Sequence, residues 1–538
     1  MVDIKNTIKN LYAYIFGIGL IANAQALFLN TDATDSIRAY GSTQALMTSG
    51  RFVGHYLDII FEQLGFYFPF RYINILLYIA YTAMAVIFIL LIFNVKDRLR
   101  GCLIGAIIMT SAVNSGVLVY YYVAHMYGFC LLISMISAYL LLNKKMTVIP
   151  ALLLALSLGI YQAYLATVVL VIFLYQFIAI TNKKVNVKVW FSDVIRCALT
   201  SMVALIIYIL ANKLALNLSG LSMAGYLNMS SNVVPSYQKD QIIKLLFESY
   251  MLIYHLIFTA KYFFCDNIVI RLCIAASFIS FLWLYVALLM QQKSIAKRCW
   301  LIILFLLLPC IINLPMFISA EVPERISLNW YFIFVIPILL SDVTQTDQNR
   351  KYNIIIQSIH RHVTAVMIVT VTVASLYSTY RNVNIYTSMS KANTLAEDIV
   401  DDIEHRIAEC DGFTADKELC FVGILDTEIT NGMFFNVEYS EYLYKLFNRD
   451  YSSIFKRYAL LNYKYLTPDD KRVKTYSTDD IKNGTAMNKN DEFFCVKDIH
   501  VGFPTIHSNN DTIKRMPSYP SYGCVQEVNG TIIIKLSN

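Results

Sequence analysis

The sequence predicts an α-helical membrane protein that crosses the bilayer many times and carries a C-terminal extracytoplasmic α+β domain. Hydrophobic residues make up 57% of the 538 residues and charged residues only 15%, whereas an average soluble domain has about 25% charged residues. Up to about Tyr380, long apolar runs alternate with short polar links. Beyond Arg381 the chain is polar, and no further run is long enough to cross a bilayer.

About eleven apolar runs approach the roughly 20 residues that a spanning helix needs, some of them shorter. They begin near Leu11, Tyr72, Cys102, Ala124, Thr147, Ala163, Phe191, Asn267, Trp300, Leu328 and His362. The first run follows Lys5 and Lys9 and lacks a clear small-residue cleavage site, so we interpret it as a span and not as a signal peptide. We therefore expect a membrane bundle over residues 1–380 and a separate domain over residues 381–538.

Basic residues occupy every second link of this bundle, together with the N-terminal segment. These links contain Lys96, Arg98 and Arg100; Lys144 and Lys145; Lys183, Lys184 and Lys188; Lys293, Lys297 and Arg298; and Arg350, Lys351 and Arg361. Because basic links tend to stay in the cytoplasm, we expect a cytoplasmic N-terminus and an extracytoplasmic C-terminal domain. The formal net charge of +7 is therefore explained by orientation and does not indicate nucleic-acid binding.

The second long outward link covers residues 217–266. Within it, residues 245–264 are apolar. Glu248, His255 and Lys261 interrupt this run, which favours an interfacial or re-entrant helix over a further span. If the segment did span, every later link would change sides and the alternation of basic links would fail.

The C-terminal domain has both helix and strand patterns. Three isoleucines recur at helical spacing, with acidic residues on the other face: Ile399, Ile403 and Ile407. Residues 421–425 are typical of a buried strand. Residues 525–528 and 531–535 predict a hairpin with a type I′ turn at the Asn-Gly pair between them.

Four cysteines lie in the C-terminal domain: Cys410, Cys420, Cys495 and Cys524. In an oxidising compartment they could form two disulfides by any of three pairings. The alternative is four unrelated buried thiols. The other seven cysteines lie in or beside apolar runs, and none has the spacing of metal ligands.

The first outward loop, residues 29–71, gathers charged side chains where the first span leaves the membrane. Asp32 or Thr34 can cap a helix. That helix would carry Asp35 and Arg38 into the space above the bundle, and a second, amphipathic helix should then lie flat on the bilayer surface. Two carboxylates at the membrane edge suit a general base that acts on a hydroxyl acceptor. They are also compatible with a helix cap and solvated loop charges.

Other polar residues occur at the same outer level of the membrane. His125 lies near the outer end of a span, and Tyr161 and Gln162 mark a tight outward turn. Glu321 and Arg325 occupy the short link before the tenth span. A cavity that opens outward would explain this coincidence, whereas interhelical hydrogen bonds and interfacial tyrosines explain only some of it. His125 taken alone is best interpreted as structural.

Three sequence features resemble the serotype-converting O-antigen glucosyltransferases: the loop TDATDSIRAYG…SGRF, the Tyr161-Gln162 turn and the Pro-x-Arg element at residues 323–325. The resemblance covers about residues 10–380. It implies a multi-span GT-C fold in the bacterial inner membrane. It further implies transfer of a sugar, glucose in this family, from a polyprenyl-phosphate carrier to a surface polysaccharide, with inversion, on the outer face.

By this resemblance, Asp35 corresponds to the second acid of the loop's usual pair and is the expected general base. Arg38 and Arg51 correspond to its two arginines. The chain departs from the pattern at Thr34, where the first acid is expected, and Asp32 stands two positions away. This departure leaves open whether one carboxylate suffices or Asp32 takes part in catalysis.

The expected partners are a polyprenyl-phosphate-linked sugar, a surface polysaccharide, the lipid bilayer, and a donor flippase with a polyprenyl-phosphate sugar synthase. Arg51, Arg325 and Lys261 are outward cations suited to the donor phosphate. The chain has no nucleotide-binding glycine loop, which fits a lipid-linked donor. No cofactor is expected, although a divalent cation stays possible because GT-C enzymes differ in metal use.

Three alternatives remain from the sequence. A flippase or transporter for lipid-linked oligosaccharides would typically have charged residues deep in several spans and repeated halves, and neither is evident. A polysaccharide polymerase or ligase would place its key residues in large later loops, such as residues 217–266. A noncatalytic membrane scaffold would not require Asp35.

Overall fold

The computed structural model describes residues 2–29, 31, 44–64, 71–182, 185–223, 239–259, 267–318, 324–346, 354–413, 418–422, 511–528 and 531–535. The chain divides into two compact units. The first comprises Met1–Phe28 and Ser42–Val383, and the second comprises Leu29–Gly41 and Asn384–Asn538.

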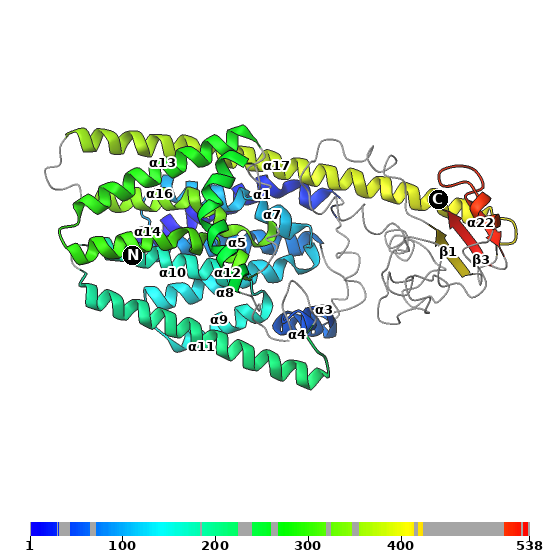
Figure 1. Ribbon diagram of the computed structural model, residues 1–538, viewed down its shortest axis with the longest axis horizontal. Coiled ribbons are helices and arrows are strands. Elements are labelled where there is room, and N and C mark those ends of the chain that lie inside the picture. Colours follow the sequence, from blue (N-terminus) through cyan, green and yellow to red (C-terminus); the bar gives the residue numbers. More distant parts are fainter. Residues whose placement is uncertain are drawn as a thin grey trace. The chain divides into compact units, whose positions relative to one another are not determined.

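The first unit is a bundle of helices (Figure 1). Nine helical segments within the described residues are long and apolar enough to cross a membrane. They lie in α1 (Val2–Phe28), α5 (Arg71–Ile92), α8 (Tyr121–Leu142), α10 (Tyr164–Thr181), α11 (Val187–Ser219), α12 (Lys239–Tyr254) with the π-helical turn His255–Thr259, α13 (Ile268–Gln291), α14 (Ile295–Ile312) and α17 (Ile354–Ala408). The chain is thus a multi-pass membrane protein.

The remaining helices of the bundle are shorter or broken. They are α3 (Gln44–Thr48), α4 (Phe52–Gln63), α6 (Arg98–Thr110), α7 (Ala112–Leu118), α9 (Val148–Ile160), α15 (Leu314–Ile318) and α16 (Leu328–Thr346). α6 and α7 meet at a bend of 43° and make a tenth candidate span if they are counted together. Asn114 stabilises this break, because its amide donates to the carbonyls of Ile108 and Met109 (both 2.8 Å) while Tyr78 donates to its oxygen (2.7 Å).

The prediction of about eleven spans needs correction, although each of the eleven runs does form a helix. The runs near Thr147 and Leu328 give apolar segments of only 10–17 residues. Conversely, Gln241–Thr259, which we expected to be interfacial or re-entrant, is long and apolar enough to span. Hydrophobicity locates helices, whereas the length of each helix depends on where the chain turns.

Where the structure describes them, the links after α5, α8, α10 and α13 meet at one end of the bundle, which we call the basic end. Side chains join the links to their neighbours: Asn143 donates to Ile92 O (3.3 Å), Arg196 to Leu141 O (3.0 Å) and Lys297 to Asn182 O (2.7 Å). Leu11 near the start of α1 also lies against Gly101 of α6. These contacts place the links after α5, α8, α10 and α13 together.

The contacts of α12 fit a helix that enters and leaves at the end opposite the basic end. The end of α11 lies there, because Leu216 packs with Met47. α13 ends at the basic end, so its start lies at the opposite end. Directly after the end of α14, the side-chain amide of Asn313 donates to Ser249 in the middle of α12 (3.3 Å). α12 therefore has its middle level with a helix end, despite a length and composition that would allow a span.

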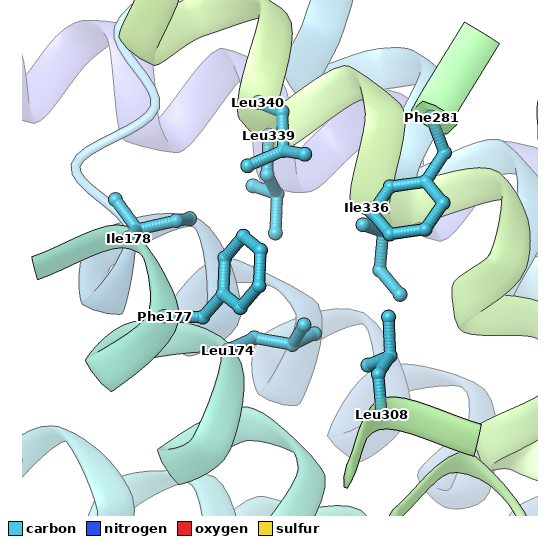
Figure 2. Close-up of a pocket in the computed structure, with 8 residues that line it drawn as sticks. All are labelled: Leu174, Phe177, Ile178, Phe281, Leu308, Ile336, Leu339 and Leu340. Atoms are coloured by element: carbon cyan, nitrogen blue, oxygen red, sulfur yellow. The ribbon is translucent and has the colours of Figure 1, made fainter. Parts of the chain in front are cut away.

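Between α10, α13, α14 and α16 lies a wholly apolar contact region, the apolar junction. Figure 2 shows the eight side chains that surround it: Leu174, Phe177, Ile178, Phe281, Leu308, Ile336, Leu339 and Leu340. The space among them does not admit a water molecule. This part of the bundle is therefore held by close packing alone.

The second unit contains the last turns of α17, α22 (Asp511–Arg515) and a three-stranded sheet. β3 (Thr531–Lys535) is central, parallel to β1 (Glu418–Val422) and antiparallel to β2 (Val525–Val528). Three consecutive buried isoleucines, Ile532, Ile533 and Ile534, suit a central strand that is covered on both faces.

Several C-terminal predictions are confirmed. Ile399, Ile403 and Ile407 are all buried, as their helical spacing indicates. The hairpin strands have the predicted bounds, whereas the strand expected at 421–425 is observed at Glu418–Val422. Residues 423–425 and the hairpin turn lie outside the described residues.

Two of the four C-terminal cysteines can be assessed. Cys410 and Cys524 are not joined in a disulfide, which favours unrelated thiols over disulfides for this pair. Cys524 is buried, and Arg406 donates to its sulfur at 3.7 Å. Cys495 and the side chain of Cys420 lie outside the described residues.

Candidate functional site

Five of the ten site residues proposed from the sequence fall within the described part of the chain: Arg51, His125, Tyr161, Gln162 and Arg325. The other five, Asp32, Asp35, Arg38, Lys261 and Glu321, lie outside it. The structure therefore describes the two arginines of the proposed site and the side chains around them, but neither of the proposed catalytic carboxylates.

A tight turn between α3 and α4 presents Arg51. Gly50 adopts a left-handed conformation with φ of +76°, and the amide of Arg51 donates to Leu46 O at 2.8 Å. A Cβ atom at Gly50 would lie 2.8 Å from both the amide nitrogen of Gln162 and the hydroxyl oxygen of Tyr208. Glycine is needed here for its backbone conformation and for this close approach.

Gln162 and Tyr208 hold the backbone of this turn. The Gln162 amide nitrogen lies 3.0 Å from the carbonyl oxygens of Ser49 and Gly50 and 2.8 Å from the Tyr208 hydroxyl. The Tyr208 hydroxyl donates to Gly50 O at 3.0 Å. Since an amide group has two hydrogens, the three acceptors share them. Side chains from the α9–α10 turn and from α11 thus fix the segment that carries Arg51.

The side chain of Arg51 lies against two stacked tyrosines. Its guanidinium donates to the Tyr127 hydroxyl at 2.9 Å, and its central carbon lies 4.9 Å from the centre of the Tyr161 ring. The rings of Tyr127 and Tyr161 stack with centroids 4.1 Å apart. A guanidinium favours both contacts because it donates in its plane and attracts aromatic rings through its face.

Arg325 also interacts with Tyr161, from the segment that precedes α16. It lies in the 3₁₀ helix Glu324–Ile326, with its guanidinium 5.2 Å from the centre of the Tyr120 ring. Burial raises the pKa of Tyr161 to about 12, and the positive charges of Arg325 and Arg51 oppose that rise. We call Arg51, Tyr127, Tyr161 and Arg325 the arginine–tyrosine cluster.

The cluster can bind an anion, because two guanidinium groups act on one buried phenol. Arginine matches phosphate oxygens in geometry and charge. The ring of His125 packs edge-on against Phe61 of α4, with centroids 5.9 Å apart. The described residues contain no group of three or more His, Cys, Asp or Glu side chains that could hold a metal ion.

Two residues of the site escaped the sequence analysis. Tyr127 belongs to a tyrosine-rich stretch that resembles an interfacial belt. Tyr208 lies within a long apolar helix and has no sequence signal of its own. The sequence signal that could have pointed to Tyr208 is Gly50, because a glycine in a turn often allows another side chain to approach the backbone closely.

Comparison with protein families gives a match to the family described as Glucosyl transferase GtrII, over residues 24–341. The match covers more than half of the chain and includes Arg51, Gln162 and Arg325. Neither the curated proteins nor the solved structures contain a significant match. The predicted resemblance to serotype-converting O-antigen glucosyltransferases is confirmed, and the chain belongs to the GtrII family of glucosyl transferases.

Proposed function

We propose that this glucosyltransferase takes glucose from a polyprenyl-phosphate carrier and transfers it, with inversion, to a surface polysaccharide at the outer face of the bacterial inner membrane. The family assignment supports a glucosyltransferase that acts in O-antigen modification. The donor carrier, the mechanism and the side of the membrane are parts of our proposal.

The observation that carries the proposal is the convergence of Arg51 and Arg325 on Tyr161. A polyprenyl-phosphate donor needs cations beside the phosphate, because negative charge develops there as the bond to glucose breaks. Groups already oriented toward that charge stabilise the transition state without reorganisation. The cluster offers two such groups, held by aromatic rings and, for Arg51, by a braced turn.

The distribution of charge supports the proposed side of the membrane. The basic links after α5, α8, α10 and α13 meet at one end of the bundle where the structure describes them, and basic links favour the cytoplasm. Arg51, by contrast, lies in the α3–α4 turn. Gln162 holds that turn from the link between α9 and α10, at the end of α9 that is remote from its basic link. The donor would then be bound from the outer leaflet, which requires a separate synthase and flippase to supply it.

In the proposed reaction, the carboxylate of Asp35 removes the proton from an acceptor hydroxyl. The oxygen attacks the anomeric carbon and forms the new glycosidic bond, while the bond from that carbon to the phosphate oxygen breaks. The electron pair leaves with the polyprenyl phosphate, whose charge Arg51 and Arg325 balance. Asp35 is assigned by its sequence motif, with Asp32 as the second acid.

Further roles remain proposals from sequence position. Arg38 and Lys261 are additional cations for the donor phosphate, and Glu321 is a contact for sugar hydroxyls. A divalent cation is a further candidate, whose involvement metal chelation would test. His125 is assigned to packing beside the site because of its contact with Phe61.

The test is a transfer assay with the full chain in lipid nanodiscs, polyprenyl-phosphate glucose and an O-antigen acceptor. Asp35→Asn should abolish measurable transfer, and Arg51→Lys and Arg325→Lys should raise the apparent KM for the donor. Asp193→Asn is a control, because Asp193 pairs with Lys145 and Arg196 at the basic end. Wild-type transfer by Asp35→Asn would overturn the assigned base, and unchanged donor KM in both lysine variants would place the phosphate elsewhere.

The same system separates the alternatives. A flippase would move labelled donor across vesicles without an acceptor, and a polymerase or ligase would change the length or anchor of the acceptor chain. Addition of single glucose units, without either effect, is the expected outcome.

A further inference from the structure

The second unit contains a cavity of about 670 Å³ between the end of α17 and the segment that leads into β2. Its lining includes Asp402, Arg406 and Glu409 from α17, and Tyr522 and Glu527 from the C-terminal segment. This volume falls within the roughly 300–1,000 Å³ of typical ligand pockets.

The walls of the cavity are tied together. Arg406 forms an ion pair with Asp402 at 2.9 Å and donates to Ser521 O at 3.2 Å. Its guanidinium also lies 5.6 Å from the centre of the Tyr519 ring. These contacts join α17 to the C-terminal segment, so the cavity belongs to the folded unit.

Tyr522 lines this cavity and is nevertheless 95% exposed. It precedes Gly523, whose φ of +84° belongs to a tight turn. Tyr519, three residues earlier, is buried at 9% exposure and serves the packing. A ring that contributes so little to packing is free to stack on a ligand, because it presents a flat apolar face beside a polar hydroxyl.

The charges at the cavity favour a neutral, hydroxyl-rich ligand. Its carboxylates, Asp402, Glu409, Asp411 and Glu527, outnumber the arginine, and Arg406 is already paired with Asp402. Such a surface repels phosphate. Carboxylates accept hydrogen bonds from hydroxyl groups, and the described residues gather no metal-binding group.

We propose that this cavity binds a neutral saccharide segment of the polysaccharide acceptor, with Tyr522 stacked on a sugar ring and Glu409 accepting from sugar hydroxyls. The proposal rests on the proposed function, since it names the binding site for that acceptor. It concerns recognition of the acceptor chain and assigns no reacting group to the second unit.

The test measures binding of purified neutral O-polysaccharide to the full chain in nanodiscs, by calorimetry and without donor. Tyr522→Ala should raise the Kd about tenfold, as expected when one aromatic anchor is removed, and Glu409→Gln should raise it less. Tyr522→Trp should keep the affinity. Arg515→Ala is the matched control, because Arg515 is exposed in the same unit and does not line the cavity.

The outcomes separate this inference from the proposed function. Arg51→Ala should lose transfer and still bind the polysaccharide. Wild-type affinity in both Tyr522→Ala and Glu409→Gln would overturn the inference, as would loss of binding on chelation, which would indicate a cation site. A wild-type chain that transfers glucose but does not bind the polysaccharide would also overturn it and leave the proposed function standing.

Discussion

The apolar junction and the arginine–tyrosine cluster belong to the same bundle, yet different forces hold them together. At the junction only apolar side chains meet, in a space that excludes water. Because lipid tails are as apolar as these side chains, close packing is the main attraction there. At the cluster, Arg51 donates a directed hydrogen bond to Tyr127, and the turn that carries Arg51 is fixed by hydrogen bonds from Gln162 and Tyr208. Substitutions at the junction should therefore change stability, and substitutions at the cluster should change the reaction.

The largest effect on transfer is expected from Arg51→Ala. Loss of one group that stabilises developing charge should lower the transfer rate by about 100- to 1,000-fold. The thermal unfolding midpoint in detergent should fall less than for a substitution at the apolar junction, because the polar contacts of Arg51, such as those with Tyr127 and Tyr161, are lost and no closely packed apolar side chain is removed. If Arg51→Ala unfolded at a much lower temperature but transferred glucose at the wild-type rate, the cluster would serve stability and not the reaction, contrary to this comparison.

A smaller loss is expected from Gly50→Ala. The new Cβ would lie 2.8 Å from Gln162 and Tyr208, and a misplaced Arg51 should slow transfer by about 10- to 100-fold. Gly220→Ala is the matched control, since Gly220 also has a positive φ (+68°) but no atom within 4 Å of a Cβ. The transfer rates of both variants should be measured. Equal losses in the two would show that backbone strain alone causes the effect.

His125→Phe should change transfer less. An edge-on contact between aromatic rings contributes about 0.5–1.5 kcal/mol, and a phenyl ring can replace the imidazole against Phe61. The donor KM should rise by less than about threefold, which corresponds to under 1 kcal/mol. A much larger rise in the donor KM would return His125 to the substrate-binding residues.

The smallest effect on transfer is expected from Phe177→Ala at the apolar junction. In the cores of soluble proteins, Phe→Ala lowers the free energy of unfolding by roughly 3–5 kcal/mol. Here the loss should lie toward the lower end of that range, because an apolar side chain gains little free energy by moving from lipid into the protein. Both KM values should stay unchanged in the folded fraction. Leu152→Ala, at a position 53% exposed, is the control for unfolding measurements. A raised donor KM in Phe177→Ala would connect the junction to the site.

Much of the bundle was predictable because a spanning helix needs a long run of apolar residues, which is visible in the sequence. Each apolar run became a helix, and the buried isoleucines of α17 followed their spacing. Helix ends were less predictable, as α12 illustrates: its residues satisfy the rules for a span, yet Ser249 meets the end of α14. That contact joins residues 64 positions apart, and local hydrophobicity carries no information about it.

For the site, charge and turn signals identified Arg51, Gln162 and Arg325, because charged and amide groups are costly in an apolar setting. Those signals did not identify Tyr208, since one tyrosine in an apolar helix is compatible with many environments. Its role depends on Gly50, 158 residues away in the chain. Interactions of this range arise from packing, which a single sequence does not display.

The dryness of the apolar junction has an electrical consequence. Many membranes hold a voltage or an ion gradient, and a multi-helix protein that let water pass between its helices would dissipate either one. A constriction lined only by hydrocarbon resists wetting and blocks ions. By filling the space among α10, α13, α14 and α16 with leucine, isoleucine and phenylalanine, the chain insulates that part of the bundle. The bundle can then hold polar and charged groups at the arginine–tyrosine cluster without opening a path for ions among these four helices.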